Sequence, residues 1–214
     1  MPAVLEKKRR QKDGTDDKRA RLLAAALDLF ETRGFDGVAV PEIAAKAGVA
    51  VGTVYRYFET KEALVNALYR QWKQAYNDLV LAPAPKNIRA RDLFTRIWHR
   101  MTLFARTNPR AVRFLDLHHH AAYLDEESRT LSKSYAQFAE EFVRNARAEG
   151  TIRDLDPIMV VALMWGAAVG LTKFAASGAL EFDARMAGDM EDALWRAIAT
   201  DSQRGEEHGT QTQG

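Results

Sequence analysis

The chain has no cysteine among its 214 residues, so disulfides, thiolate nucleophiles and cysteine-based metal sites are excluded. It also lacks a long apolar run. The longest uncharged stretch, Pro157–Thr172, is shorter than the roughly 20 residues that span a bilayer, and it predicts a buried helix instead. The basic residues at 7–12 are not followed by an apolar segment. We therefore expect no secretory signal, no membrane partner and a cytoplasmic protein.

Motifs typical of catalysis are missing as well. There is no glycine-rich phosphate loop, no Gly-x-Ser-x-Gly elbow and no His-Glu-x-x-His pair. The segment from Gly166 to Gly170 lies inside a predicted helix rather than after a strand. Paired acids such as Glu126-Glu127 are typical of solvated helix faces. We therefore expect a protein that is not an enzyme, with no catalytic residues and no cofactor.

Helical periodicity is present throughout. No segment alternates apolar and polar residues over a useful length, so strands are not expected and the predicted fold class is all-α. A first helix is expected from Asp16 to a glycine stop at Gly34, and Thr60 can cap a long helix whose outward residues include Lys73 and Gln74. The helix capped by Thr60 is expected at about residues 61–81. The later helices are expected at about 88–106, 109–120, 126–149, 157–177 and 183–200.

Residues 38–64 carry the strongest functional pattern. Ala44 is small where a second helix must approach, and Gly48 permits a positive φ in the turn between two crossing helices. Gly52, Thr53 and Arg56 are left on the outer face of the short second helix. Small residues with a cation behind them can enter a DNA major groove, so the pattern indicates a helix-turn-helix. The apolar inner face of the two helices is supplied by Ile43, Ala47, Val49, Val54 and Tyr57.

Through these residues the chain resembles the TetR family of bacterial transcriptional regulators. The resemblance lies within about residues 15–70 and departs from the family at Ala39-Val40-Pro41, where Thr or Ser usually precedes the second helix. The usual hydroxyl cap is thus missing, although proline is favourable at the first helical position. The matching residues are Gly34-Phe35, Ile43-Ala44, Ala47-Gly48-Val49, Gly52 to Phe58 and Lys61 to Leu64.

The resemblance implies a repressor that binds a palindromic double-stranded DNA operator as a homodimer and is released by a small-molecule effector. A ligand would shift the fourth helix and change the separation of the two reading helices. By position on the second helix, four residues are expected nearest to base edges, whereas the resemblance assigns Tyr55 and Lys61 to phosphates. The base-edge set is Val51, Gly52, Thr53 and Arg56.

Four regions are expected along the chain. Residues 1–14 form a disordered basic arm, 15–61 the helix-turn-helix domain, 62–202 a larger helical domain for ligand binding and dimerisation, and 203–214 a disordered tail. Through Lys61 there are 12 basic against 9 acidic side chains, and the remainder has 19 against 20. We favour the interpretation that the basic residues of this arm keep the protein soluble. The alternative, that the arm enters the minor groove of DNA, stays open.

Small residues recur at four-residue spacing at Ala162, Gly166 and Gly170. This pattern lets another helix backbone approach closely. The neighbour is either a helix of the same chain or the same helix of a partner. The resemblance favours the partner, because TetR-like proteins pair their last two long helices into a four-helix bundle.

A set of bulky side chains falls on apolar faces of the predicted helices in the larger domain. Such stripes are usually core, but in a ligand-sensing family they favour a mainly apolar effector chamber with His118 as its polar anchor. The run His118-His119-His120 gives no metal site, because consecutive helix positions point about 100° apart. The chamber is predicted to be lined by Trp98, Met101, Phe104, Phe114, His118 and Trp165.

Two functions therefore compete at this stage. One is a ligand-responsive transcriptional regulator that binds its operator selectively. The other is a helical small-molecule-binding or catalytic protein with only non-selective DNA association. Competition with excess random DNA separates them, because only selective binding survives it.

Overall fold

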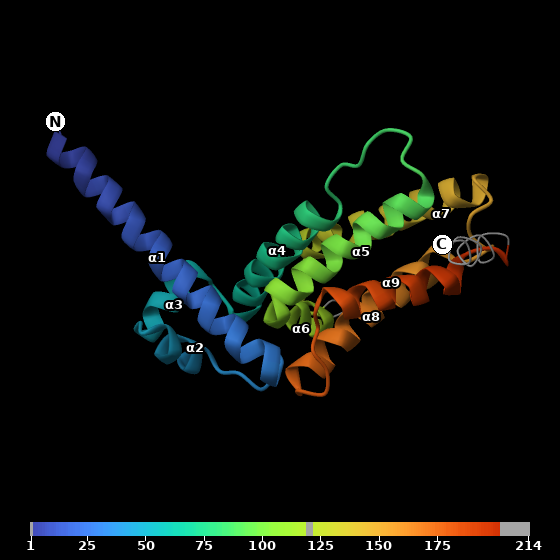
Figure 1. Cartoon of the computed structure of the whole chain (residues 1–214). Coiled ribbons are helices and arrows are strands. Elements are labelled where there is room, and N and C mark those ends of the chain that lie inside the picture. The colour runs from blue at the N-terminus through green and yellow to red at the C-terminus, as the bar shows by residue number, and fades with distance from the viewer. Residues whose placement is uncertain (1, 119–121, 202–214) are drawn as a thin grey trace. The chain divides into compact units, whose positions relative to one another are not determined.

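The computed structural model describes residues 2–118 and 122–201, and only the backbone of residues 2–16. These residues form nine helices and no strand, which confirms the all-α fold class (Figure 1). A single antiparallel bridge within this part of the chain joins Ile152 to Ala199. The helices are α1 (Pro2–Arg33), α2 (Val40–Ala47), α3 (Val51–Tyr57), α4 (Lys61–Val80), α5 (Ala90–Thr107), α6 (Pro109–His118), α7 (Glu126–Ala148), α8 (Pro157–Ala176) and α9 (Ala184–Ile198).

The chain divides into two compact units. Unit 1 contains the residues up to Trp72 together with Phe114–Ser128, and unit 2 contains Lys73–Arg113 together with the residues from Arg129 onward. The division falls inside α4 and again inside α6, whereas a boundary at the beginning of α4 was expected from the sequence. Two helices therefore continue from one unit into the other.

Unit 1 is built on α1, against which α2 packs, and α3 packs in turn on α2 (Figure 1). The side of α1 that faces the core of unit 1 is apolar: Leu22 and Leu23 are buried, and so are Ala26 and Phe30. The helix ends at Gly34, which donates from its amide to the carbonyl of Phe30 at 3.0 Å and whose φ of 67° turns the chain out of the helix.

The beginning of α1 differs from the expectation. The backbone is already helical at Pro2, whereas residues 1–14 were predicted to form a disordered arm. Lysine, arginine, glutamine and alanine in this segment have high helix propensity, and the segment continues the helix whose later part packs on α2. The charge of this segment favours solvation, but solvation does not require loss of helix.

Phe114–Ser128 belongs to unit 1 because polar side chains of α4 hold it. The buried side chain of Asn66 donates from Nδ2 to the carbonyl of Tyr123 at 2.8 Å, and its Oδ1 accepts from the amide of Asp125 and the hydroxyl of Ser128. Arg70 forms an ion pair with Asp125 at 2.6 Å. Both polar atoms of the Asn66 amide are thus satisfied, so this contact is specific rather than merely apolar.

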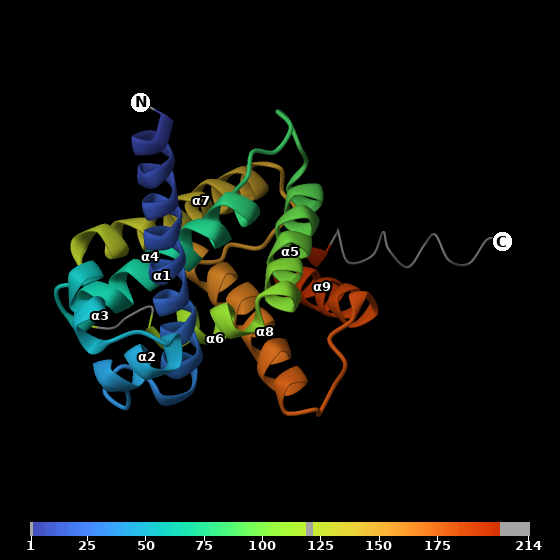
Figure 2. The same ribbon diagram turned by 90° about the vertical axis from the view of Figure 1, so that its left-hand side faces the viewer.

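Unit 2 packs α5 against α8 and α9, and α8 against α9 (Figure 2). The core side of α5 carries Phe94 and Trp98, which are both fully buried. The indole of Trp98 donates to the carbonyl of Ala187 at 2.7 Å, and Phe94 contacts Trp195 at 5.3 Å between ring centroids. These contacts fix α9 along α5.

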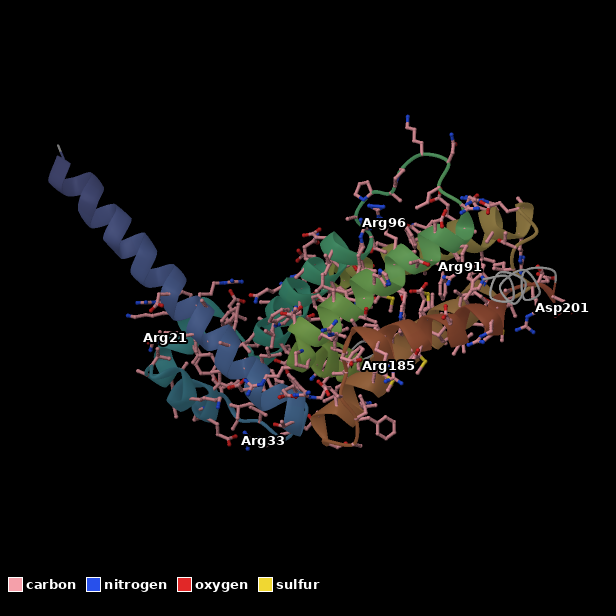
Figure 3. All side chains as sticks on the ribbon, viewed as in Figure 1. Arg21, Arg33, Arg91, Arg96, Arg185 and Asp201 are labelled. Carbon is pink, nitrogen blue, oxygen red and sulfur yellow. The ribbon has the colours of Figure 1, made fainter. Side chains whose placement is uncertain are left out.

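A buried carboxylate joins the same two helices. Glu191 of α9 accepts from Arg91 (labelled in Figure 3) and from the hydroxyl of Thr95, both at 2.6 Å. Its second oxygen lies 3.2 Å from the Nε2 of His99. A buried charge is tolerated when such partners surround it. The cluster sets the register of α9 on α5.

The helix α8 is covered on one side only. It is long and apolar enough to cross a membrane by length and composition, and a third of its most apolar window is buried. The sequence predicted a buried helix here, which is wrong for the single chain. Ile158 and Phe174 are 62% and 57% exposed. The physical reason is that α5 and α9 cover only the face that carries Met164, Ala168 and Leu171.

Candidate DNA-binding site and effector cavities

The turn between α2 and α3 has the geometry that the sequence predicts. Gly48 adopts φ 66° and ψ 40°, and its amide donates to the carbonyl of Ala45 at 3.1 Å. Arg21 of α1 (labelled in Figure 3) donates to the carbonyls of Ala47 at 3.1 Å and Gly48 at 3.0 Å. A cation therefore stabilises the carboxyl end of α2 and fixes the turn on α1.

The missing hydroxyl cap of α2 has a substitute. The carboxylate of Glu42 accepts from the amide of Ala39 at 2.8 Å and pairs with Arg33 at 2.9 Å. The hydrogen bond from Ala39, followed by that from Arg33, lowers the pKa of Glu42. The acid stands three residues after Ala39 and is the acidic half of a capping box, a signal that the sequence contained but that was not recognised there.

Most of the outer face of α3 is exposed within the described chain, although Thr53, which was predicted to face outward, is half-buried. Val54 is buried and fixes the helix on unit 1, whereas Val51, Gly52 and Arg56 are exposed and Tyr55 is 51% exposed. A Cβ built on Gly52 would meet no described atom within 4 Å. This leaves the first turn of α3 slim, as entry into a major groove requires.

The start of α4 lies directly after α3. The hydroxyl of Thr60 accepts from the amide of Ala63 at 3.0 Å, which confirms the predicted cap. Lys61 is half-buried, and its ammonium lies 4.1 Å from the centroid of the Phe35 ring. The guanidinium of Arg56 lies 5.5 Å from the Tyr57 ring. The two cations are thus positioned by aromatic faces, and their contacts with DNA stay predictions.

The residues predicted for the effector chamber fall into two separate groups. Trp98, Met101, Phe104 and Trp165 belong to unit 2, whereas Phe114 and His118 belong to unit 1. All of these except Trp165 are buried. None of the six lines either of the two cavities described below. Their role as ligand contacts stays a prediction.

His118 lies inside unit 1, where aromatic side chains surround its ring. Its ring lies 4.5 Å from Phe114 and 6.1 Å from Phe30, and its Nδ1 is hydrogen-bonded to the hydroxyl of Tyr123. Burial lowers the pKa of His118 below its ordinary 6.5. His119 and His120 lie outside the described residues. Among those described, no group of three His, Asp or Glu is arranged to hold a metal ion.

This burial predicts acid sensitivity. The folded protein disfavours protonated His118, while the unfolded chain takes up the proton near pH 6.5. Stability from this residue is therefore full above pH 6.5 and is lost as the pH falls below it. We expect His118→Asn to lower the free energy of unfolding at about pH 7.5 yet to flatten its decline towards about pH 5.5. Urea denaturation at several pH values measures this; parallel curves for both proteins would contradict it.

Described residues of unit 2 line a larger and a smaller cavity. The larger, about 690 Å³, is formed by the ends of α5 and α8, the beginning of α6 and the segment before α9. Arg106 and Arg113 contribute its cations, and Leu103 and Phe182 are among its apolar walls. The smaller, about 20 Å³, lies between α5, α7 and α8 and is lined by apolar side chains and Tyr135. This volume is enough for about one water molecule and too small for an effector.

Lys73 was predicted to point outward from α4, and this is wrong. The side chain is half-buried, and its ammonium lies 5.2 Å from the ring centroids of both Tyr76 and Tyr135. Burial lowers the pKa of Lys73 to about 8. Charge alone suggested exposure, but the stem of a lysine packs readily along aromatic rings.

The slim outer face of α3, fixed by Val54 and the Gly48 turn, defines a helix-turn-helix protein that carries a second helical unit. Two family models extend this description over most of the chain. Residues 22–68 match that of bacterial regulatory proteins of the tetR family, and residues 69–200 match the tetracyclin repressor-like C-terminal domain. The chain belongs to the TetR family of bacterial regulators.

Individual relatives agree with this membership. The chain is 31% identical over 126 residues to the HTH-type transcriptional repressor KstR of Rhodococcus jostii, and 29% identical over 123 residues to the probable HTH-type transcriptional regulator ArpR of Pseudomonas putida. These matches span 56% and 55% of this chain and 59% and 57% of those proteins. The chain thus matches little more than half the length of these curated relatives.

Solved structures share the fold. A TetR family transcription regulator from Marinobacter aquaeolei VT8 aligns with a TM-score of 0.75 at 24% identity, covering 89% of this chain and 98% of that one. A tetR family regulatory protein from Rhodococcus RHA1 aligns with a TM-score of 0.73 at 19% identity, covering 86% and 98%. The likeness extends across both units at the level of fold.

Proposed function

We propose that this protein is a cytoplasmic transcriptional repressor that binds a palindromic operator as a homodimer and is released by a mainly apolar small molecule. The observation that carries the proposal is the outer face of α3. Val51, Gly52, Tyr55 and Arg56 are exposed on this helix, and the buried side chain of Val54 fixes its opposite face on unit 1. Membership of the TetR family supports the same function.

Base contacts and phosphate contacts are divided between two groups of residues in this proposal. Val51, Gly52, Thr53 and Arg56 read base edges, whereas Tyr55 and Lys61 hold phosphates. The exposure of Tyr55 and the position of Lys61 in the first turn of α4 support this division. Base contacts specify the sequence, and phosphate contacts fix the protein on the duplex.

The division predicts two different mutant phenotypes. Lys61→Ala should weaken binding to all sequences alike and reduce the slope of log affinity against log salt by about one. Arg56→Ala should instead cost about 1–3 kcal/mol at one base pair and relax the preference there. Titration of one operator and its point variants at several salt concentrations measures both effects. Identical behaviour of the two mutants would remove the division.

Dimerisation through α8 is supported by its uncovered face. Residues 158, 162, 166, 170 and 174 lie one helical turn apart, with Ile158 and Phe174 exposed at the two ends. A Cβ on Gly166 or Gly170 would meet no atom within 4 Å, so neither glycine is needed for packing within the described chain. The same helix of a second copy fits this stripe of small residues, and it would cover the apolar face without a membrane.

The route from effector to DNA runs through continuous helices in this proposal. The helix α4 begins at Lys61 beside the reading helix and passes into unit 2 at Lys73, and α6 passes from unit 2 into unit 1 at Phe114. Within unit 1, α6 ends at His118 among aromatic rings of α1 and Tyr123. A ligand that displaces either helix in unit 2 would change the spacing of two reading helices, which must match half-sites about 34–36 Å apart.

A further inference from the structure

Lys73 is a cation that no carboxylate of residues 17–118 and 122–201, whose side chains the structure describes, neutralises. Its ammonium contacts the rings of Tyr76 and Tyr135 and forms no ion pair within that part of the chain. Two cation–π contacts offset only part of the cost of removing an ammonium from water. At neutral pH the side chain is nevertheless mostly protonated, because its pKa is lowered only to about 8.

A buried hydroxyl beside this cation has no hydrogen-bond partner of normal geometry among the described side chains, although it interacts with the hydroxyl of Tyr135. The hydroxyl belongs to Tyr76, which is 2% exposed. Burial raises the pKa of Tyr76, and it raises that of Tyr135 to about 12, so both phenols keep their protons. The interior of unit 2 thus places an ammonium beside two phenolic hydroxyls, and no described carboxylate pairs with the ammonium.

The surroundings of this donor pair are apolar and aromatic. Tyr76 makes edge-to-face contacts with Phe104 at 5.3 Å and Trp165 at 5.5 Å. Tyr135 is also a wall of the 20 Å³ cavity, whose other walls are all apolar. Asn77 donates to the carbonyl of Leu131 and the hydroxyl of Ser134, which fixes α7 next to α4.

We infer that unit 2 binds a monocarboxylate with an apolar body, whose carboxylate pairs with Lys73 and Tyr76 and whose body extends past Tyr135 between α5, α7 and α8. This inference rests on the proposed function in one respect, since it names the chemical class of the effector. It replaces His118 as polar anchor by Lys73. The cavity must widen to admit the body, and half-buried Phe138 is the side chain whose rotation would open it.

The inference predicts opposite effects of one substitution on stability and on binding. Lys73→Met keeps the stem of the side chain and removes the uncompensated charge, so the ligand-free protein should melt at a higher temperature. A lysine with a purely structural role would give a lower melting temperature. Lys86→Met, at an exposed position of unit 2, is the matched control and should change neither property.

Binding is measured without DNA, from the tryptophan emission of the protein titrated with octanoate, decanoate and benzoate and with 1-octanol, 1-decanol and benzyl alcohol. We expect at least one acid to bind the wild type at least about tenfold more tightly than its alcohol, and Lys73→Met to abolish this preference. Equal binding of each acid and its alcohol, no binding of any acid, or a preference that survives Lys73→Met would each overturn the inference. Loss of the preference in Arg106→Gln alone would overturn it too, by assigning the acid to the 690 Å³ cavity.

Operator release is measured separately with the same acids. Binding that depends on Lys73 but leaves operator affinity unchanged would uphold the carboxylate site and contradict the proposed release by effector. Selective operator binding by a protein that takes no acid would uphold the DNA-binding function and overturn the site. The two proposals therefore fail in different measurements.

Discussion

Gly52→Glu should abolish operator binding while the protein stays folded. The Cβ of residue 52 meets open space, and the residue lies in the first turn of α3, where an acidic side chain is favourable to the helix. On the DNA the same carboxylate would enter a groove lined by phosphates. A like charge in such a contact costs several kcal/mol, so the affinity should fall by at least about 100-fold.

The matched control adds the same charge elsewhere. Ala136 is exposed on α7 in unit 2, and Ala136→Glu should leave operator affinity within about twofold of the wild type. Fluorescence anisotropy of labelled operator gives the affinities, and circular dichroism with thermal melting establishes that both variants are folded. A folded Gly52→Glu protein that still binds the operator would remove α3 from the DNA interface.

Gly170→Leu should separate the dimer without unfolding the chain. No described atom lies within 4 Å of a Cβ at this position, so the first atom of a larger side chain meets open space within one copy. Between two copies it would hold the helix backbones apart. Overpacking costs about 1–3 kcal/mol, which is roughly a 5- to 150-fold weaker dimer, and operator binding should weaken with it.

Sedimentation at low protein concentration measures this equilibrium directly. Ala136→Leu, which adds the same side chain to an exposed position of α7, should remain as dimeric as the wild type. If Gly170→Leu is folded and fully dimeric, the glycine stripe of α8 is not the seam. The uncovered apolar face of α8 would then require another partner.

Local chemistry made much of the fold predictable. Asp156 accepts from the amide of Ile158 with Pro157 in the first turn, and Gly150 and Gly178 end their helices with φ of 70° and 75°. Each of these signals depends on a residue and its immediate neighbours. The Gly48 turn is also a local signal of this type. The amino-acid sequence is therefore sufficient to place the helix-turn-helix.

Long-range contacts could not be predicted in the same way. The grouping of Phe114–Ser128 with unit 1 depends on Asn66, which lies more than 50 residues away from its partners in the chain. The side chains of α5 and α6 that were predicted to line a chamber are buried, as a core would also require. Periodicity could not reveal that they belong to different units, and so it joined Trp98 and His118 in one chamber.

Lys73 shows the same limit for a functional residue. The spacing of Lys73, Tyr76 and Asn77 puts all three on one face of α4, but a lysine is normally solvated and nothing in the sequence opposes that interpretation. Its burial depends on Tyr135 of α7, which packs against it from a distant part of the chain. Lys73 can be recognised as a buried cation only from its contact with the Tyr135 ring, and that contact is known only from the tertiary structure.

Selective retention of DNA is the most direct test of the account. Purified protein is mixed with sheared genomic DNA from its own source in the presence of excess random DNA, and the retained fragments are sequenced. We expect a few sites that share a palindrome whose half-site centres are about 34–36 Å apart, roughly one turn of the duplex. Retention spread evenly over the genome and removed by random DNA would contradict it, because the helix-turn-helix would then bind DNA without reading it.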